Sequence, residues 1–390
     1  MNSCPLTAAV CLQDPDSPRT WSGTPAHLIA ALRRRGMLID TFAVGDTRAI
    51  KVVSLASYQS RRVLQVDPAS SLRNFRDLRG SRRSDYLRMC GPRHRAARRV
   101  ARLPHKQILH VGWPFALPPL SGVSRQHHFL ICDSTWSIAI TNPLLGDRFS
   151  ADAVAEAEGL ESRALHACEA IFAISGHVRD ELVNHYHIHP SRVHIIGTGP
   201  GAFSPYAGPK DYELRTVLFV AKVRPEEKGL GLLLNAFRRA RAAYPVASLV
   251  LVGHPSYPAL SSRLDNVSGY DHVTFGQLEA LFHEAALYAM PAIHEPWGLV
   301  YLEALLTRTP VLGLDRLALP EITQQGGLGF LSSEATTDAV TATLMDALSS
   351  PERLRSMGLA GRDATVHRYS WDRSASIIQQ VMRPDLGEGS

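Results

Sequence analysis

Two glutamates, Glu295 and Glu303, are separated by seven residues in a segment that has the pattern of a binding loop and the helix after it. An apolar run typical of a buried strand, 286–291, comes before them. We predict that Glu295 lies in the loop and Glu303 about one and a half turns into the helix, with both carboxylates on the ligand side. Gly298 would allow backbone N–H groups, beginning with that of Leu299, to approach a ligand at the helix start, where the dipole favours anions.

A second group of candidate residues is cationic. Lys222 comes two positions after the apolar run 216–220. Lys228 follows directly before Gly229, and Arg224 lies between the two lysines. Two cations at such a spacing can hold a diphosphate from both sides and neutralise the charge that grows on it as a leaving group. The alternative interpretation is a pair of solvated surface lysines.

The first half of the chain offers weaker candidates. Gly23 lies in a loop before a predicted helix at 25–35, and Asp133 directly follows an apolar run. A carboxylate in that position can orient an acceptor hydroxyl or accept its proton. His110 is an alternative polar residue at the end of the preceding run, and Ser175 has the position of a helix N-cap.

The elements that carry these residues alternate along almost the whole chain. Short β-branched apolar runs separated by helical patterns predict parallel sheets with crossover helices, hence an α/β fold. A Gly/Pro-rich segment, 197–209, separates two series of such runs and predicts a connection between domains. We place the first domain at 1–204 and the second at 212–368, with a last helix at about 370–385. The runs are 7–12, 108–111, 128–132, 170–174 and 193–196, then 216–220, 248–252, 286–290 and 309–312.

These motifs together resemble glycosyltransferase family 4, whose members are retaining enzymes of the GT-B type. The resemblance implies two Rossmann-like domains that face each other across a cleft, with the C-terminal helix returning to the first domain. It also implies transfer of a hexosyl unit from a UDP- or GDP-linked sugar to a hydroxyl acceptor, with no cofactor and no metal ion. The stretches that carry it are 217–222, 227–237, 249–253, 273–276 (as a strand leading into a helix), 278–282, 295–304, 319–321, 327–331 and 369–371.

The resemblance gives each donor-site candidate a role. Glu295 would contact the donor sugar, and Glu303 would bind the ribose hydroxyls of the nucleotide. Lys222 and Lys228 would bind the diphosphate, with the amides after Gly298 adding contacts to the phosphate or the sugar.

In the first domain, the resemblance implies that the loop of Gly23 faces the donor phosphate and the acceptor. Asp133 stands where many relatives carry a His-Asp pair near the reacting sugar. This sequence departs from the family pattern at three positions: it has Lys222 for Arg, Cys132 for His, and Arg308 for Gly.

The composition is that of a soluble globular protein of two domains, with 390 residues of which 45% are hydrophobic and 20% charged. No apolar run approaches the ~20 residues that span a bilayer. The apolar stretch 4–12 has no cation before it and no small-residue cleavage site after it. We therefore expect a cytoplasmic protein. Its five cysteines lack CxxC spacing, which argues against a disulfide framework and a structural zinc site.

The net charge of +6 is concentrated between Arg73 and Arg102, where eleven arginines accompany two acids. Such a segment is either a solvated helical face or a surface for anionic lipids or an anionic acceptor. The second interpretation predicts peripheral association with the inner membrane face. Nucleic acid is not an expected partner, because the segment has few aromatic residues for base stacking.

The acceptor remains open between a glycan, a lipid-linked molecule and a small molecule. Two alternatives to a transferase would have the same fold: a catalytically degenerate binding protein and a nucleotide-sugar epimerase. A nicotinamide-dependent dehydrogenase is excluded, because the segment 12–23 lacks the glycine pattern of a dinucleotide loop.

Overall fold

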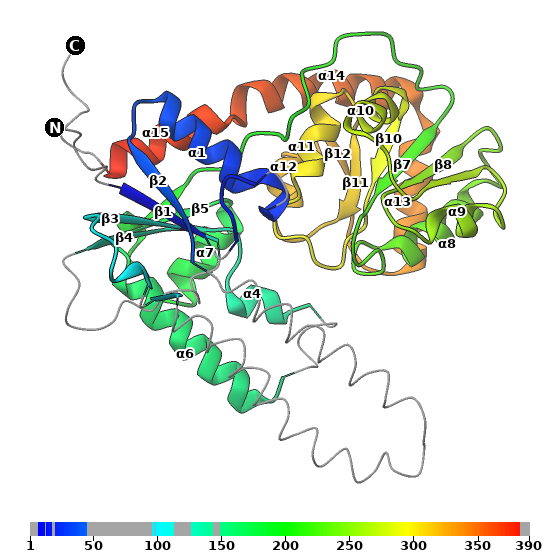
Figure 1. Cartoon of the computed structure of the whole chain (residues 1–390). Coiled ribbons are helices and arrows are strands. Elements are labelled where there is room, and N and C mark those ends of the chain that lie inside the picture. Colours follow the sequence, from blue (N-terminus) through cyan, green and yellow to red (C-terminus); the bar gives the residue numbers. More distant parts are fainter. Residues whose placement is uncertain are drawn as a thin grey trace. The chain divides into compact units, whose positions relative to one another are not determined.

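The computed structural model describes residues 7–11, 13–17, 20–44, 96–97, 99–112, 126–142 and 149–382. The chain divides into two compact units, which we call unit 1 (Met1–Ile196 with Asp372–Ser390) and unit 2 (Gly197–Trp371). Most of the predicted arginine-rich segment, 73–102, lies outside the described residues. The segment 197–204, which we assigned to the first domain, belongs to unit 2. Figure 1 shows the elements of each unit.

The described part of unit 1 contains a parallel sheet with the strand order β2-β1-β3-β4-β5-β6. All five residues of β1 are buried, which is typical of a parallel sheet covered on both faces. Its elements are β1 (Thr7–Cys11), η1 (Thr20–Gly23), α1 (Thr24–Arg34), β2 (Ile39–Ala43), β3 (Gln107–Val111), β4 (His127–Cys132), α4 (Trp136–Ile140), α6 (Ala151–Ala167), β5 (Ala170–Ala173), α7 (Gly176–Asn184), η3 (Pro190–Arg192), β6 (Val193–Ile195) and α15 (Trp371–Met382), whose first residue belongs to unit 2.

Helix α15 returns to unit 1 after the chain has passed through unit 2 (Figure 1). Arg35 of the α1 C-cap forms an ion pair with Asp372 at 3.0 Å and donates to Gln379 at 3.1 Å. At the far end of α15, the Gln107 side chain donates to the carbonyl of Met382 at 2.8 Å. The predicted return of the last helix to the first domain is confirmed.

Unit 2 contains a second parallel sheet, with the strand order β12-β11-β10-β7-β8-β9. Helix α8 packs against α13, and α11 packs against α14. Its elements are β7 (Thr216–Val220), α8 (Leu230–Ala240), β8 (Ser248–Val252), α9 (Tyr257–Ser261), β9 (Val267–Tyr270), α10 (Phe275–Glu284), β10 (Leu287–Ala289), α11 (Leu299–Leu306), β11 (Val311–Leu314), α12 (Leu319–Ile322), β12 (Gly329–Ser332), α13 (Thr337–Ser349) and α14 (Pro351–Arg368).

The predicted α/β class is confirmed, and β7 and β8 have the predicted bounds. The strand predicted at 273–276 is wrong. There the Thr274 hydroxyl accepts from the amide of Gln277 and begins α10, whereas the strand β9 lies earlier, at Val267–Tyr270. A capping box outweighed the β-branched residues in this stretch. None of the helices in the described part of the chain combines the length and apolar character that a membrane crossing requires.

Candidate functional site

The loops that follow β7 and β10 bring Lys228 and Glu295 into contact at the carboxyl edge of the unit 2 sheet. The Lys228 ammonium lies 2.7 Å from a Glu295 carboxylate oxygen and 3.4 Å from the carbonyl oxygen of His294. The two side chains are 21% and 20% exposed, so each charge is partly desolvated and still accessible. A cation and a carboxylate predicted from distant parts of the sequence therefore form one polar centre.

Close packing of these two loops requires glycine at position 229. Gly229 has φ +82 and precedes the first residue of α8. A Cβ at this position would lie 2.1 Å from the carbonyl oxygen of Pro291, which no side chain tolerates. The loops are also joined by a backbone hydrogen bond of 2.8 Å from Ile293 to Glu227. The position of Lys228 relative to Glu295 is thus fixed by the backbone.

Gly298 determines how the chain enters α11. Its φ of +82 and ψ of 79 lie outside the region that other residues adopt readily. A Cβ there would lie 2.6 Å from the ring of Tyr301 and 3.0 Å from Cγ of Glu295. Leu299 is the first residue of the helix, so its amide is among those that have no partner within the helix.

Glu303 lies on the same helix, between the buried residues Leu302 and Ala304. Its carboxylate faces the backbone of Gly201, where a Cβ would lie 2.0 Å from Oε1. Burial raises the pKa of Glu303 to about 7, and the charge of Lys222 acts in the opposite direction. Lys222 follows the carboxyl end of β7, with its Cγ 3.1 Å from where a Cβ on Gly253 would be. The four predicted donor-site side chains therefore lie at one edge of the sheet.

Arg224, which lies between the two lysines in the sequence, forms an ion pair with Glu227 at 3.2 Å. The Arg224 side chain is 70% exposed, so this pair contributes little to stability.

The segment Gly197–Gly201 is part of the site, although we interpreted it only as a connection. The Trp297 indole donates to the Thr198 hydroxyl at 2.7 Å. A Cβ on Gly199 would lie 2.4 Å from the Trp371 ring, and Gly201 lies against Glu303. The signal in the sequence was the close spacing of the glycines, which marks a backbone that other groups approach closely.

Arg308 stands where glycosyltransferase family 4 has glycine, and its backbone has a conformation that suits glycine. Its φ is +60, the left-handed conformation that glycine adopts at little cost. The Arg308 guanidinium donates to the carbonyl of Gly208 at 2.9 Å and to that of Ala207 at 3.3 Å. These bonds join α11 to the segment before β7 and offset part of the backbone strain.

In unit 1, Gly23 immediately precedes α1 and has φ +82. Trp21 and Ser22 before it also have positive φ, 47 and 55, which is uncommon for residues with a side chain. Strained backbone of this kind is found at ligand-binding turns. The turn follows β1 and so lies at the carboxyl edge of the unit 1 sheet, where ligands of open α/β sheets bind.

Asp133 lies at the same edge, directly after β4, in a turn that is firmly held. Thr135 caps α4 by accepting from the amide of Ile138 at 3.3 Å. The fully buried carboxylate of Glu161, on α6, accepts from the amide of Trp136 at 2.8 Å and from the Tyr186 hydroxyl. Sequence reasoning missed Glu161, because its partners Trp136 and Tyr186 each lie 25 positions away in the sequence.

Cys132, directly before Asp133, and His110, in the neighbouring strand β3, are buried core residues. The Cys132 thiol donates to the carbonyl of Ser134 at 3.2 Å, and burial raises its pKa well above the usual range. His110 lies 2.9 Å from His128 through their ring nitrogens. Burial and the neighbouring His128 lower the pKa of His110, so this histidine is neutral near pH 7.

Ser175 lies at the N-cap position of α7, but its hydroxyl contacts the His177 ring at 2.9 Å rather than the helix backbone. Asp16, in the Asp14-Pro-Asp16 stretch, forms an ion pair with Arg33 and accepts from the Thr41 hydroxyl. The described residues contain no group of three or more His, Cys, Asp or Glu side chains arranged to hold a metal ion.

Part of unit 2 is similar in sequence to a known protein family. Residues 206–364, within unit 2, match the family model described as glycosyl transferases group 1. Alpha-maltose-1-phosphate synthase of Mycolicibacterium smegmatis is 27% identical over 256 residues, 57% of this chain and 65% of that protein. D-inositol 3-phosphate glycosyltransferase of Segniliparus rotundus is 30% identical over 231 residues, 54% of this chain and 51% of that protein. The chain thus covers from about half to 65% of the length of these relatives.

A solved structure extends the likeness over both units. Sucrose-phosphate synthase from Thermosynechococcus elongatus superimposes with a TM-score of 0.67 and covers 97% of this chain and 98% of its own, at 16% identity. The chain has the GT-B fold. In this fold, the carboxyl edge of each sheet carries the candidate residues of its unit: Lys222, Lys228, Glu295 and Glu303 in unit 2, and Gly23 and Asp133 in unit 1.

Proposed function

We propose that the protein is a retaining glycosyltransferase of the family 4 type, which moves a hexosyl unit from a UDP- or GDP-linked sugar to a hydroxyl acceptor. The contact between Lys228 and Glu295 carries this proposal. In a nucleotide sugar the diphosphate is bonded directly to the anomeric carbon of the sugar. A cation for the phosphate and a carboxylate for the sugar hydroxyls must therefore be neighbours, as Lys228 and Glu295 are.

The remaining donor-site residues fit the rest of such a donor. Glu303 would accept from the ribose hydroxyls, and Lys222 would bind the diphosphate together with Lys228. Gly298 and the amide of Leu299 would bring the positive end of α11 to the phosphate or sugar oxygens. The two lysines supply the charge that a metal ion supplies in other transferases, and we propose that this reaction needs no metal.

The reaction would form a glycosidic bond between the acceptor oxygen and the anomeric carbon as the bond from that carbon to the diphosphate breaks. Attack on the face that the diphosphate leaves retains the configuration. The departing diphosphate would take the acceptor proton, and its negative charge would be stabilised by Lys228. Asp133 would orient the acceptor hydroxyl for this step, and Gly23 would approach the donor phosphate.

The names of the relatives guide the choice of acceptor. One relative is named as a synthase of alpha-maltose 1-phosphate, and the other as a glycosyltransferase of D-inositol 3-phosphate. We propose a polyhydroxylated acceptor, either free or part of a glycan or a glycolipid. Association with an anionic membrane through the segment 73–102, at the cytoplasmic face, remains a prediction.

Calorimetric titration with UDP and with GDP tests the donor site. We expect one nucleotide to bind saturably, and we expect Glu303→Ala to weaken this binding at least tenfold, because the ribose hydroxyls lose their acceptor. Glu284→Ala is the matched control, since Glu284 is an exposed glutamate on α10. It should bind like the wild type.

Saturable binding that is insensitive to Glu303→Ala would remove the assigned role of Glu303. A folded wild type that binds neither nucleotide would favour a degenerate binding protein on the same fold. Release of free hexose from the donor, with the α anomer formed first from an α-linked donor, would support retention.

A further inference from the structure

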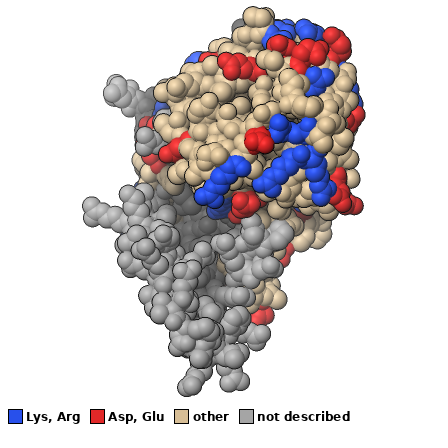
Figure 2. Space-filling model, turned by 90° about the vertical axis from the view of Figure 1, so that its right-hand side faces the viewer, with Lys and Arg blue, Asp and Glu red and all other residues tan. Residues whose placement is uncertain are grey.

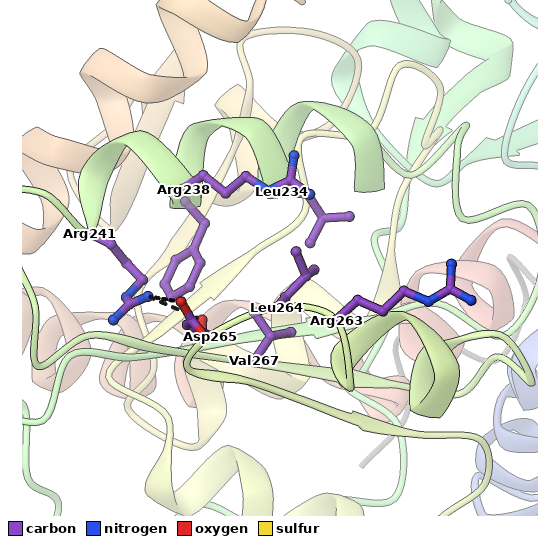
Figure 3. A pocket seen from close by; sticks show the side chains of 8 residues that line it. Leu234, Arg238, Arg241, Arg263, Leu264, Asp265 and Val267 are labelled. Carbon is purple, nitrogen blue, oxygen red and sulfur yellow. Dashed lines mark hydrogen bonds and ion pairs between the residues drawn. The ribbon is translucent and has the colours of Figure 1, made fainter.

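Unit 2 contains a pocket of about 290 Å³ between α8 and the connection from α9 to β9 (Figure 3). Apolar side chains line it: Leu234 and Phe237 from α8, and Leu264 and Val267 from the connection and β9. None of the residues proposed to bind the donor lines this pocket.

Three arginines surround the apolar lining. Arg238 and Arg241 extend from α8, and Arg263 extends from the opposite side, as Figure 3 shows. The one acid in the lining is Asp265, which lies 3.8 Å from Arg241 and is 94% exposed. An ion pair of this length and exposure neutralises little charge.

The guanidinium groups are poorly satisfied by the protein. Within the described part of the chain, the side chains of Arg238 and Arg263 have no hydrogen bond or ion pair. The Arg241 guanidinium donates to the carbonyl of Asp265 at 3.5 Å, and its buried Nε has no hydrogen-bond partner. Figure 2 shows the side of unit 2 that lies at the right in Figure 1, where α8 and α9 are. Lys and Arg side chains gather on this face. A bound anion would give these guanidinium groups charged hydrogen-bond partners.

We propose that this pocket binds a small phosphate monoester whose carbon skeleton has an apolar face. A phosphate dianion offers several oxygens to planar guanidinium forks, and Arg238 and Arg263 would turn theirs toward it from the two sides of the pocket. The carbon skeleton would pack on Leu234 and Phe237. The volume lies at the lower end of the range for small-molecule sites, which suits a ligand with a single ring.

Titration with phenyl phosphate tests the proposal, because this probe combines one phosphate with one apolar ring. The charge variant is Arg238→Gln with Arg263→Gln. The control is Arg239→Gln, which removes one positive charge from the same helix as Arg238; Arg239 pairs with Asp338 and does not line the pocket. A third protein, Lys222→Gln with Lys228→Gln, removes the cations of the proposed donor site. Circular dichroism checks that each variant is folded.

We expect saturable binding to the wild type, to the Arg239 control and to the lysine variant, and at least tenfold weaker binding to the arginine variant. We also expect phenol, which has the ring without the phosphate, not to bind measurably. Binding lost in the lysine variant and kept in the arginine variant would assign the phosphate to the donor site and overturn the proposal. Equal weakening by Arg239→Gln, equal binding of phenol or no saturable binding to the wild type would overturn it as well.

Discussion

At the scale of single residues, Glu303 is placed where binding and stability oppose each other. The carboxyl group is held between buried residues of α11 and against Gly201, and burial raises its pKa from 4.5 to about 7. Between these values the folded protein keeps a proton that the unfolded chain releases. The stability contributed by this group is therefore full below about pH 4.5 and is lost as the pH rises toward 7. A residue retained at such a cost is a candidate for ligand binding.

Glu303→Gln should consequently raise the free energy of unfolding at pH 8, because the glutamine carries no charge into the buried position. We expect a gain of about 1–3 kcal/mol at pH 8 and little change at pH 4.5, measured by urea unfolding. The exposed Glu284→Gln is the control and should shift stability equally at both values. A Glu303→Gln effect that is the same at pH 4.5 and pH 8 would contradict the raised pKa.

At the scale of elements, the turn into α11 aligns Glu295 with the helix. Gly298 allows this turn through its positive φ, and it also allows the Tyr301 ring and Glu295 to lie directly against the backbone. The Tyr301 hydroxyl donates to the carbonyl of Met290 at 2.9 Å, which ties the helix to the end of β10. The glycine, the ring and the strand end thus determine the position of Glu295 together.

Gly298→Ala should destabilise the protein by about 1–3 kcal/mol, since alanine is strained at this φ and its Cβ meets Tyr301 and Glu295. Nucleotide binding should weaken as well, because Glu295 and Lys228 must shift. Thermal unfolding and calorimetry measure the two effects. Gly276→Ala, in α10, is a suitable comparison, because a Cβ at Gly276 meets nothing within 4 Å. It should be neutral or slightly stabilising. Equal stability of the two variants would refute the requirement for glycine at 298.

At the scale of the whole molecule, the chain crosses from unit 1 into unit 2 and then returns through α15. The buried face of this helix is formed by Ser374, Ala375, Ile378 and Met382. The Ser374 hydroxyl donates to the carbonyl of Ile196 at 3.0 Å, close to the point where the chain leaves unit 1. The C-terminal helix is thus an integral part of the unit that contains the N-terminus.

Ile378→Ala should therefore destabilise unit 1, by about 2–4 kcal/mol, because it leaves a cavity under a fully buried side chain. The exposed Gln380→Ala on the same helix is the control and should cost less than about 0.5 kcal/mol. Hydrogen exchange followed by mass spectrometry would locate the loss. Faster exchange in β1 and α1 is expected, whereas a change confined to unit 2 would contradict the assignment of α15.

The sequence predicted the fold class and most of the second sheet, because apolar runs and crossover helices repeat along the chain with clear boundaries. Strands at edges were harder to predict. β2 has a single buried residue and β9 has none, so neither shows a clear apolar run, and the strand expected in place of β9 was predicted at 273–276. Their pairing partners, which lie elsewhere in the chain, decide their position.

By itself, the sequence determined that Lys222, Lys228 and Glu295 belong to loops that follow buried strands and that Glu303 belongs to the next helix, since strand, turn and helix are local patterns. Only the tertiary structure decided that Lys228 contacts Glu295, that Gly201 covers Glu303 and that Glu161 holds the turn of Asp133. These contacts join residues from 25 to 102 positions apart. Their geometry depends on the order of strands in each sheet and on where a backbone without a Cβ lets another group approach, and no local pattern encodes either.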